Sequence, residues 1–335
     1  MKVNNPFFSI LIPTYNREQY LNKAIVAILK QTFKNFEIVI SDNNSSDSTR
    51  EIVLSFKDSR IKYIKNAKKI TWIGNLQKAI SLSKGRYIIF HGDDDYMKNS
   101  NALKHIYKHL TKNNYGFIRA NYLSVNDKTG KIFNFNKDNK FLTNKSLNPN
   151  LGNYEIIKFL EKVDPFFLTG IILKQNKKNR LINSELIPWI DMLIGNIKES
   201  GGFFISKYLF FARWIDKDKN PNHPFFYIKE GKFSFEKYLL FLQKSLNKEE
   251  ANEFIDKIIR ELIRHFPANK YSNTNFNLIK GARRVIQLRK KFLYSFSFWF
   301  WLVSSLLIPK LMLKFMKRYS LNKIVREGSI GKNII

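Results

Sequence analysis

The sequence predicts an α/β protein with a doubly wound, mostly parallel β-sheet, flanking helices and a helical region at the C-terminus. Over the first hundred residues, short apolar runs of β-favouring residues alternate with segments of helical periodicity. From about residue 233 onward, the apolar positions follow helical spacing alone. We therefore expect two domains, at residues 1–230 and 231–335, the first with parts at about residues 1–100 and 101–230.

The first β-α-β unit is predicted at the N-terminus. An apolar strand at residues 7–12 is closed by Pro13-Thr14-Tyr15-Asn16, and the apolar positions of a helix follow at Leu21, Ala24, Ile25, Ile28 and Leu29. The second strand covers residues 36–41 and ends in Asp42. A turn-rich segment comes next, in which Glu51 lies three residues after Ser48, as in a helix capping box.

Further strands are predicted at residues 61–64 and 87–90, and an acidic cluster follows the second of these. The chain continues through Gly92 into Asp93, Asp94 and Asp95. Adjacent carboxylates repel one another, so they favour a cation or solvent at this edge of the sheet, where α/β proteins bind ligands. Carboxylate oxygens suit Mn²⁺ or Mg²⁺. Taken alone, an acidic turn without a ligand is an equally good interpretation.

The regular alternation weakens after the acidic cluster. Strands are expected at residues 115–125 and 166–173. Pro188 opens a helix whose apolar residues are spaced i, i+3, i+4 and i+7, and a strand at residues 203–214 then delivers Arg213.

Charge and cysteine content restrict the classes of function. Fifty-eight Lys and Arg residues against 27 Asp and Glu residues give a formal charge of +31, which favours an anionic partner or surface. No acidic residue lies between Leu262 and Arg326, so the basic excess is concentrated near the C-terminus. The absence of Cys excludes disulfides and thiolate metal sites. Because the first apolar run is too short for a signal peptide, the sequence predicts a cytoplasmic protein.

Several short motifs occur in order along the chain. The first are Ser9-Ile10-Leu11-Ile12-Pro13-Thr14-Tyr15-Asn16-Arg17, Gln31-Thr32 and the segment from Phe36 to Asp47. The others are Gly74-Asn75, Gly85-Arg86-Tyr87-Ile88, the acidic cluster and Trp189-Ile190-Asp191. Together they resemble the inverting glycosyltransferases of family 2, which have a GT-A fold. The resemblance implies transfer of a sugar from a nucleotide-diphosphate sugar, with a UDP-sugar as the favoured donor.

This resemblance assigns roles to single residues. The nucleotide-sugar site is expected to contain Pro13, Thr14, Tyr15, Asn16, Arg17, Asp42, Asn75, Asp93 and Arg213. Asp94 is expected to bind Mn²⁺ or Mg²⁺ directly, and Asp95 to support the metal ion or face the acceptor. Gly92 occupies the first Asp slot of the family's metal motif, so the cluster departs from the family pattern and the division of roles among its aspartates stays open. Asp42 could instead cap the following turn, and Asn75 could instead cap a helix.

Inverting transfer also needs a base. The reaction is an in-line displacement, so a carboxylate must lie across the sugar from the departing diphosphate, which a metal ion stabilises. Asp191 matches the family's catalytic carboxylate, although it could merely complement the dipole of its helix. Asp164, which precedes Pro165, is the competing candidate. Arg213 and His223 are expected either at the diphosphate or on the surface.

Three other functions fit parts of the sequence. A pI near 10 with interleaved aromatic residues is typical of nucleic-acid-binding proteins, but no nucleic-acid motif occurs and the acidic cluster would repel phosphate without a metal. A metal-dependent nucleotidyltransferase would also use a metal ion and a nucleotide, but the sequence lacks the Gly-rich phosphate loop with which such enzymes normally begin. An inactive protein of the same fold is the third. We expect no nucleic-acid partner.

An uncharged, aromatic-rich run at residues 292–309 predicts contact with a membrane. Basic clusters flank it: Arg289, Lys290 and Lys291 on one side, Lys310, Lys314, Lys317 and Arg318 on the other. About 20 residues are needed to cross a bilayer, and basic residues at both ends oppose crossing. A helix lying in the membrane plane, or a hairpin bent near Pro309, would keep both basic clusters on the same side of the membrane. A helix buried in the protein is the alternative. We expect residues 280–320 to hold the enzyme on an anionic membrane surface at the inner face of the cell membrane. There it would meet a saccharide or lipid-linked acceptor of surface polysaccharide or glycan assembly.

Overall fold

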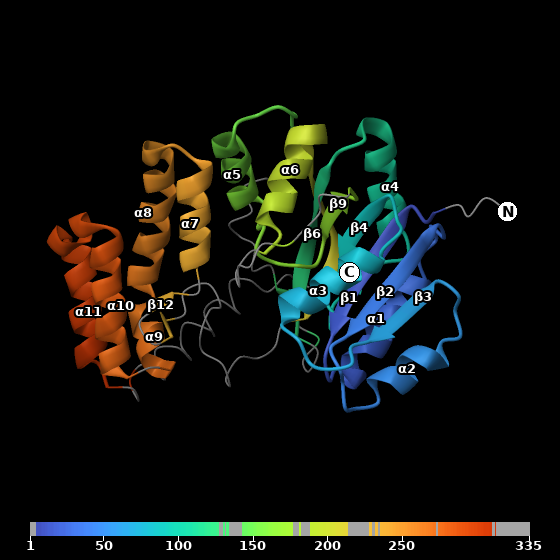
Figure 1. Cartoon of the computed structure of the whole chain (residues 1–335), viewed down its shortest axis with the longest axis horizontal. Coiled ribbons are helices and arrows are strands. Elements are labelled where there is room, and N and C mark those ends of the chain that lie inside the picture. Colours follow the sequence, from blue (N-terminus) through green and yellow to red (C-terminus); the bar gives the residue numbers. More distant parts are fainter. Residues whose placement is uncertain are drawn as a thin grey trace. The chain divides into compact units, whose positions relative to one another are not determined.

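The computed structural model describes residues 5–126, 130, 132–133, 143–176, 181, 188–213, 228–229, 232–233, 235–272, 274–309 and 312. These residues form two compact units, an α/β unit up to Arg213 and a helical unit from Ile228 to Met312 (Figure 1). The predicted domain boundary at residues 230–231 lies outside the described residues, as do His223 and the basic cluster from Lys310 to Arg318.

One large β-sheet forms the centre of the α/β unit. Its strands are β1 (Phe8–Thr14), β2 (Phe36–Asp42), β3 (Ile61–Lys65), β4 (Tyr87–Phe90), β5 (Tyr96–Met97), β6 (Phe117–Val125), β7 (Ile132–Phe133), β8 (Lys145–Leu147), β9 (Ile171–Lys174) and β10 (Gly202–Arg213). The order across the sheet is β3-β2-β1-β4-β9-β6-β10-β5. Strands β1 to β4 are parallel, β6 and β10 are parallel, and β9 runs antiparallel between β4 and β6. The predicted doubly wound, mostly parallel sheet is confirmed.

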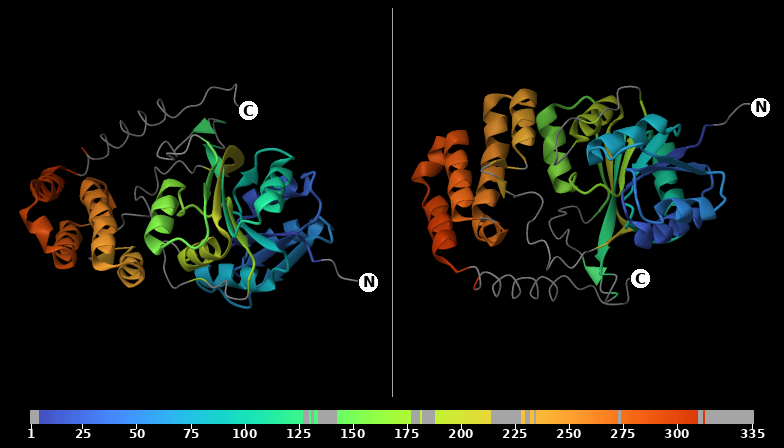
Figure 2. Two further views of the ribbon diagram at one scale, coloured as in Figure 1. Left: turned by 90° about the horizontal axis from the view of Figure 1, so that it is seen from above. Right: turned by 60° about the horizontal axis from the view of Figure 1, so that its bottom comes forward.

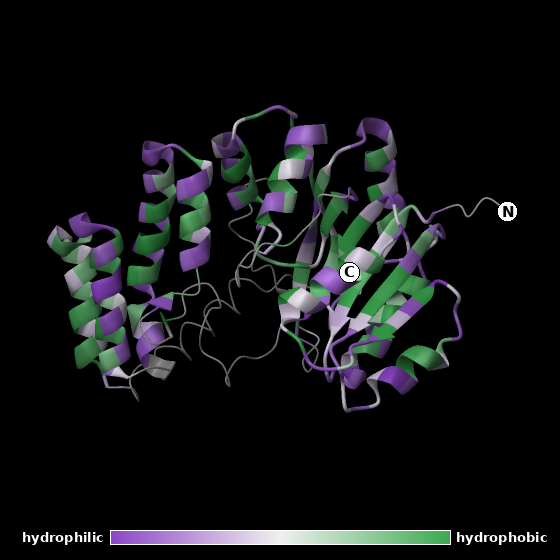
Figure 3. Cartoon of the chain, viewed as in Figure 1, coloured by the Kyte–Doolittle hydropathy of each residue, from purple (hydrophilic) through white to green (hydrophobic). Residues whose placement is uncertain are grey.

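Helices cover both faces of this sheet (Figure 2). They are α1 (Glu18–Leu29), α2 (Thr49–Ser55), α3 (Trp72–Leu82), α4 (Ala102–Asn113), α5 (Asn153–Lys162) and α6 (Ile190–Ser200). Ile10, Ile38 and Ile89 share a core cluster with apolar side chains of α1 and α4, while α3 packs on β1 and β2. Because both faces are covered, the central strands are largely apolar (Figure 3), and a slip by one residue would exchange the packed faces.

The register of the parallel strands brings their carboxyl ends to one edge. Thr14 pairs with Asp42, and Leu11 pairs with Phe90 at the end of β4. The loops after β1, β2 and β4 therefore leave the sheet side by side, at the edge where α/β proteins bind ligands.

Helix α2 begins differently from the prediction. Ser48 makes no side-chain cap bond, so the expected capping box with Glu51 is wrong. Instead, Asp47 Oδ1 accepts hydrogen bonds from the backbone N–H of Thr49 at 3.2 Å and from its hydroxyl at 2.6 Å. The Asp47 side chain thus satisfies the first turn of the helix from outside it.

The strand expected at residues 166–173 is shorter than predicted and begins only at Ile171. Gly170 has a φ of +87°, and a Cβ there would lie 2.7 Å from the carbonyl oxygen of Ala120. The chain therefore turns at Gly170, where only glycine fits, before it enters β9.

The second unit is helical, as predicted. It contains α7 (Glu236–Ser245), α8 (Lys248–Arg264), α9 (Phe266–Ser272), α10 (Asn275–Leu288), the 3₁₀ helix η2 (Lys290–Tyr294), α11 (Phe296–Leu307) and the short pair β11 (Ile228–Lys229) and β12 (Lys232–Phe233). The uncharged run from residue 292 forms the end of η2 and then α11. Within the described parts of the chain, no helix combines the length and the apolar character needed to cross a membrane.

Candidate active site

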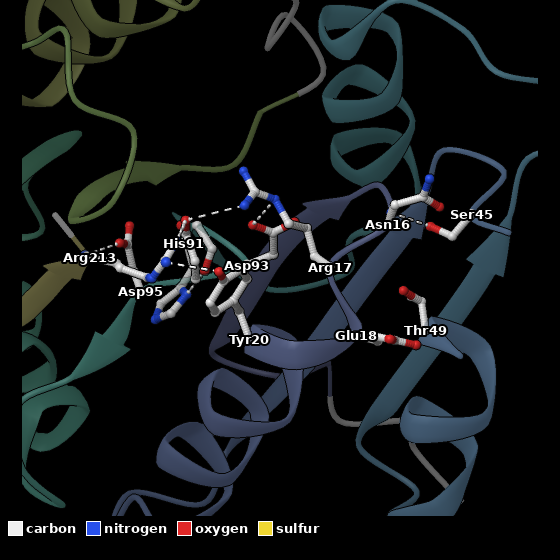
Figure 4. A network of polar contacts seen from close by, with 12 residues as sticks. Asn16, Arg17, Glu18, Tyr20, Ser45, Thr49, His91, Asp93, Asp95 and Arg213 are labelled. Carbon is white, nitrogen blue, oxygen red and sulfur yellow. Dashed lines mark hydrogen bonds and ion pairs between the residues drawn. The ribbon is translucent and has the colours of Figure 1, made fainter. Parts of the chain in front are cut away.

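The acidic cluster lies in the turn between β4 and β5, and two guanidinium groups approach it. Arg17 Nε is 3.9 Å from Asp93 Oδ1, and Arg17 Nη1 is 4.0 Å from Asp94 Oδ2. Arg213 Nη1 is 3.6 Å from the same oxygen of Asp94. Figure 4 shows the two arginines reaching toward the cluster from the start of α1 and the end of β10. Residues separated by almost 200 positions thus meet at one charged centre.

Crowding of carboxylates gives this centre an affinity for positive charge. Burial and the neighbouring Asp94 carboxylate raise the pKa of Asp93 to about 6, although Thr14 and Arg17 act in the opposite direction. The arginine contacts are longer than hydrogen bonds, so they only partly offset the repulsion. A divalent cation fits this donor set, because Mg²⁺ and Mn²⁺ take one or two carboxylates and leave other positions to substrate phosphates. No group of three or more His, Asp or Glu side chains in the described residues converges as a metal site.

Asp95 has a different environment from its two neighbours. Its Oδ1 accepts a hydrogen bond from the backbone N–H of Arg213 at 2.9 Å, and its Oδ2 accepts one from the Thr169 hydroxyl. Burial and the Asp94 carboxylate raise the pKa of Asp95 to about 7 against these bonds. Because both oxygens already bind the chain, Asp95 anchors the end of β10, and its role as a metal ligand stays a prediction.

The structure explains why glycine stands in the first Asp slot of the metal motif. A Cβ at Gly92 would lie 2.5 Å from Asp95 Oδ2, and the backbone N–H of Gly92 donates to Thr169 Oγ1 at 2.8 Å. The Asp95 carboxylate is held on both sides and cannot give way easily. A side chain at position 92 would therefore break the bridge between Thr169 and Asp95.

Tyr20 of α1 holds Arg213 in place, a role that the sequence did not predict. The hydroxyl of Tyr20 accepts a hydrogen bond from Arg213 Nη2 at 2.8 Å, and the guanidinium carbon lies 3.8 Å from the ring centroid (Figure 4). Arg17 lies over the same ring at 5.6 Å. In the sequence, Tyr20 looks like any half-buried residue of an amphipathic helix. No motif therefore indicated that it would contact Arg213.

The loop after β1 is fastened to the loop after β2. Asn16 adopts a φ of 51°, its backbone N–H donates to Ser45 Oγ at 2.8 Å, and its Oδ1 accepts from the N–H of Ser46 at 2.9 Å. Pro13 and Thr14 form the last positions of β1 and lead into this loop. The Tyr15 ring remains exposed beside this rigid turn, with the Lys69 ammonium 3.9 Å from its centroid. An exposed aromatic face on a fixed loop can stack with a nucleotide base.

Asp42 caps the turn after β2, the alternative role considered for it. Its Oδ1 accepts from the backbone N–H and the hydroxyl of Ser45 at 2.8 and 2.6 Å, and its Oδ2 accepts from the Tyr63 hydroxyl at 2.6 Å. The side chain is fully buried. Base recognition by Asp42 stays a prediction, and it requires the Tyr63 hydroxyl to move.

Asn75 likewise joins two elements of the fold. Its amide donates to the carbonyl oxygen of Ser41 at 2.8 Å, and its Oδ1 accepts from Ser41 Oγ at 2.8 Å and from Asn66 Nδ2 at 2.9 Å. The buried amide thus ties α3 to the end of β2. A direct contact with nucleotide stays a prediction, because all these atoms are used within the chain.

Asp191 lies in the first turn of α6, which the fold brings to the end of β4. Trp189, just before the helix, packs on Phe90 with ring centroids 5.9 Å apart and donates from Nε1 to the carbonyl oxygen of Pro165 at 2.7 Å. Partial burial raises the pKa of the Asp191 carboxyl, and its side chain remains accessible to solvent. No described residue hydrogen-bonds the Asp191 carboxylate. A carboxylate that is accessible and has a raised pKa suits a general base.

Asp164, the competing candidate for the base, is held by other residues. It has a φ of 52°, and its Oδ2 accepts from the Tyr122 hydroxyl at 2.7 Å and lies 3.9 Å from Arg119 Nη2. The buried Arg119 also donates to the carbonyl oxygens of Val163 and Thr169. Asp164 is therefore part of the buried network that shapes the loop carrying Thr169, and these bonds leave it poorly placed to accept a substrate proton.

The sequence of this chain is similar to those of known glycosyltransferases. Residues 9–166 match the sequence model of the family Glycosyl transferase family 2. The chain is 34% identical over 159 residues to UDP-Glc:alpha-D-GlcNAc-diphosphoundecaprenol beta-1,3-glucosyltransferase WfgD of Escherichia coli, a match covering 47% of this chain and 62% of that protein. It is 25% identical over 294 residues to GalNAc(5)-diNAcBac-PP-undecaprenol beta-1,3-glucosyltransferase of Campylobacter jejuni, covering 86% and 85%. The resemblance inferred from the motifs is confirmed.

Solved structures share the fold. S. aureus TarS 1–349 in complex with UDP-GlcNAc superposes with a TM-score of 0.56 at 16% identity, over 97% of this chain and 93% of that one. The same fragment in complex with UDP gives a TM-score of 0.52 over 95% and 88%. The expected GT-A fold is thereby confirmed.

Proposed function

Because residues 9–166 match the sequence model of Glycosyl transferase family 2, we propose that this protein is an inverting glycosyltransferase. It moves a sugar from a nucleotide-diphosphate sugar to an acceptor hydroxyl. The observation that carries the proposal is the convergence of Asp93, Asp94, Arg17 and Arg213 at the carboxyl edge of the sheet. The first turn of α6, which carries Asp191, lies beside the same strand end.

The donor proposed is a UDP-sugar, as named for the E. coli relative. Arg17 and Arg213 supply positive charge for the diphosphate, and Tyr20 keeps the Arg213 guanidinium oriented. The exposed Tyr15 ring supplies a face for the base. The bond from Arg213 to Tyr20 fixes this guanidinium before any ligand arrives, so its part in binding needs little rearrangement.

We propose Mn²⁺ or Mg²⁺ as the cofactor. Asp94 would hold the ion, and Asp95 would support that position through its bonds to Thr169 and to the Arg213 backbone. When bound, the ion neutralises charge that develops on the leaving diphosphate. The crowded carboxylates favour such an ion, because it relieves the repulsion that raises the pKa of Asp93.

Asp191 is the proposed general base. It would take the proton from the acceptor hydroxyl as that oxygen attacks the anomeric carbon. Its raised pKa makes the carboxylate a stronger base than an ordinary aspartate. The bond from Trp189 to Pro165 fixes the start of α6 and with it the position of this carboxylate.

A lipid-linked saccharide is the proposed acceptor, since the names of both glucosyltransferase relatives specify undecaprenol-linked sugars. Such an acceptor places the enzyme at the inner face of the cell membrane, in the assembly of a surface polysaccharide or glycan. A donor screen that measures release of the nucleoside diphosphate identifies the sugar.

A donor-turnover assay tests the proposal. We expect UDP release to require Mn²⁺ or Mg²⁺ and to fall by roughly 10²–10⁴-fold in Asp191→Asn, which keeps the shape but cannot accept the proton. Glu199→Gln, an exposed change on the same helix, serves as the matched control and should behave as wild type. Full turnover in excess EDTA would refute the metal, and an active Asp191→Asn with an inactive Asp164→Asn would reverse the two roles.

The same preparation separates the alternative functions. A nucleotidyltransferase would release pyrophosphate from a nucleoside triphosphate, and a nucleic-acid-binding protein would bind an oligonucleotide with salt-dependent affinity and no turnover. Either result in place of UDP release would overturn the proposed activity.

A further inference from the structure

We propose that one face of α11 is a docking surface for an anionic membrane, with the helix lying in the plane of the lipid headgroups. The surface, called here the α11 stripe, consists of Phe296, Trp299, Phe300, Val303 and Leu307. The inference concerns only the helical unit and does not depend on the proposed activity.

Helix α11 is apolar on two faces, and in the described part of the chain one of them is buried whereas the other is largely exposed. Phe298, Leu302 and Ser305 are spaced i, i+4 and i+7 and are buried. The Phe298 ring meets that of Phe266 edge-on at 6.1 Å. This face attaches α11 to the rest of the helical unit, because α11 contacts α8, α9 and α10.

The α11 stripe occupies the other face. Its members are spaced i, i+3, i+4, i+7 and i+11, which places them along one side of a helix. Phe296 is 84% exposed, Phe300 48% and Leu307 76%. A helix at the surface of a water-soluble protein normally carries polar residues on this side. A continuous apolar stripe that water contacts is typical of a surface for a partner or a membrane.

The stripe is preformed. Ser295 caps the helix by accepting the N–H of Phe298 at 3.3 Å, and the rings of Phe296 and Phe300 stack at 6.1 Å. Trp299 Nε1 donates to the carbonyl oxygen of Leu293 at 2.7 Å, which fixes the indole against η2. The aromatic side chains therefore have little conformational entropy to lose on contact with lipid.

The charge around the stripe favours anionic lipid over a second copy of the chain. Arg289 and Lys291 are paired with Asp256, and Arg284 is paired with Glu236. Arg283 and Lys290 are exposed and have no acidic partner in the described parts of the chain.

The sequence contains no Asp or Glu from residue 263 to residue 326. Two copies of the α11 stripe facing each other would bring basic surfaces together, which electrostatic repulsion opposes. Anionic headgroups complement the same surface, and each nearby Lys or Arg adds to the attraction.

The length of α11 determines its orientation. Its 12 residues span about 18 Å, well short of the hydrocarbon core of about 30 Å. One face is already committed to the protein core. An in-plane position satisfies both facts, since it buries the stripe and leaves the Phe298 face on the protein.

Vesicle flotation of the full-length protein tests the proposal. We expect binding to phosphatidylcholine vesicles that contain phosphatidylglycerol. Phe296→Ser/Phe300→Ser/Leu307→Ser should lower the partition coefficient by about 100-fold or more, because three large apolar groups are lost from the lipid contact. Leu54→Ser/Leu240→Ser, which changes two exposed leucines on other helices, is the matched control and should float like wild type. Circular dichroism and melting curves should be unchanged, since the stripe lies outside the core.

A second variant tests the electrostatic attraction to anionic lipid. Arg283→Gln/Lys290→Gln should lose most of the dependence on phosphatidylglycerol, whereas Lys104→Gln/Lys108→Gln, two exposed lysines of α4, should keep it. The proposal is overturned if wild type does not float or if the triple variant floats equally well. It is also overturned if light scattering shows a dimer that the triple variant dissociates while neither protein binds vesicles. UDP release, measured separately without vesicles, reports on the proposed activity alone.

Discussion

The carboxyl ends of β2 and β4 both carry aspartates at the same edge of the sheet, yet their surroundings differ. Asp42 at the end of β2 is fully buried, and both of its oxygens accept hydrogen bonds, from Ser45 and Tyr63. Asp93 and Asp94 after β4 repel each other, and the two arginines approach them only to 3.6 to 4.0 Å. One end is satisfied within the chain, and the other retains the capacity to bind a cation or a phosphate.

The aspartate at the end of β2 therefore serves the stability of the fold, whereas the pair after β4 is available to a ligand, although all three belong to the same series of motifs. A strand-end carboxylate that the chain satisfies lowers the energy of the folded state, because breaking its bonds would leave buried groups unpaired. A strand-end pair that repels itself raises the energy of the free protein and is relieved by a ligand. The two ends should therefore respond in opposite ways to substitution.

The largest effect is expected from Asp94→Asn. The amide keeps the shape but removes the charge that would hold the metal, so kcat/KM should fall by about 10³-fold or more. The free energy of unfolding should stay the same or rise, since a repelling charge is lost. Turnover with the proposed donor and urea denaturation check both parts, and a variant near wild type in kcat/KM would remove Asp94 from the site.

Asp42→Ala should have the opposite signature. Loss of its bonds to Ser45 and Tyr63 should lower the free energy of unfolding by about 2–4 kcal/mol, while kcat of the folded protein changes by no more than a few-fold. Tyr63→Phe, which removes one of these donors, should cost about 1 kcal/mol. Urea denaturation measures both variants. Unchanged stability with a raised KM for the donor would instead assign Asp42 to base recognition.

A smaller effect is expected at Thr169, which connects the two sides of the site. Thr169→Val removes the acceptor for the Gly92 N–H and the donor to Asp95, so the free energy of unfolding should fall by about 1–3 kcal/mol. We also expect the transfer rate to fall by about tenfold, because Asp95, which binds the Arg213 backbone, loses its bond to Thr169. Thr169→Ser retains the hydroxyl and should restore the rate. If serine and valine behave alike, the bridge has no influence on the reaction.

The smallest effect is expected in how the free energy of unfolding depends on pH. This dependence should differ between Glu37 of β2 and Asp93, which follows β4. Hydrogen bonds from Lys62, Ser9 and the Lys84 backbone outweigh burial and lower the pKa of Glu37 in β2. Glu37 therefore stabilises the protein above its unfolded pKa of about 4.3, and this contribution is lost as the pH falls through the lower folded value. Glu37→Gln should remove about 1 kcal/mol of stability at pH 7 and almost none at low pH.

Asp93 should show the reverse in the metal-free protein. Its folded pKa of about 6 exceeds the unfolded value, so its contribution is lost as the pH rises from about 4 to 6. Urea denaturation of Asp93→Asn and Glu37→Gln across this range measures both slopes. Parallel slopes in the two variants would contradict the contrast between the strand ends.

Part of the motif resemblance reflects the fold rather than the chemistry. The Gln31 side chain donates to the carbonyl oxygen of Asn99 at 2.7 Å and accepts from the N–H of Leu103 at 3.0 Å. A Cβ at Gly85 would lie 2.5 Å from the backbone nitrogen of Ser9, so only glycine fits there. These motif residues fasten loops and strands, which explains how sequence alone could predict the sheet and its functional edge.

Other parts of the site could not be predicted from the sequence. Tyr20, Thr169 and Arg119 belong to no motif, and they contact the acidic cluster or its support only because β10 and β9 lie beside β6 and β4. Asp191 was predicted from a motif, but the packing of Trp189 on Phe90 is what brings its helix to the end of β4. Likewise, the uncharged run at residues 292–309 predicted apolar contact without showing which face of α11 is exposed.

The sequence by itself determined the alternation of strands and helices in the first β-α-β units, the acidic cluster and the apolar C-terminal run, because periodicity and motif spacing are local properties of the chain. The tertiary structure decided which aspartates are satisfied. Hydrogen-bond partners such as Tyr63 for Asp42 and Thr169 for Asp95 come from distant elements, and burial depends on everything packed around a group. Those two quantities set the energy of a buried charge, and neither can be read along the chain.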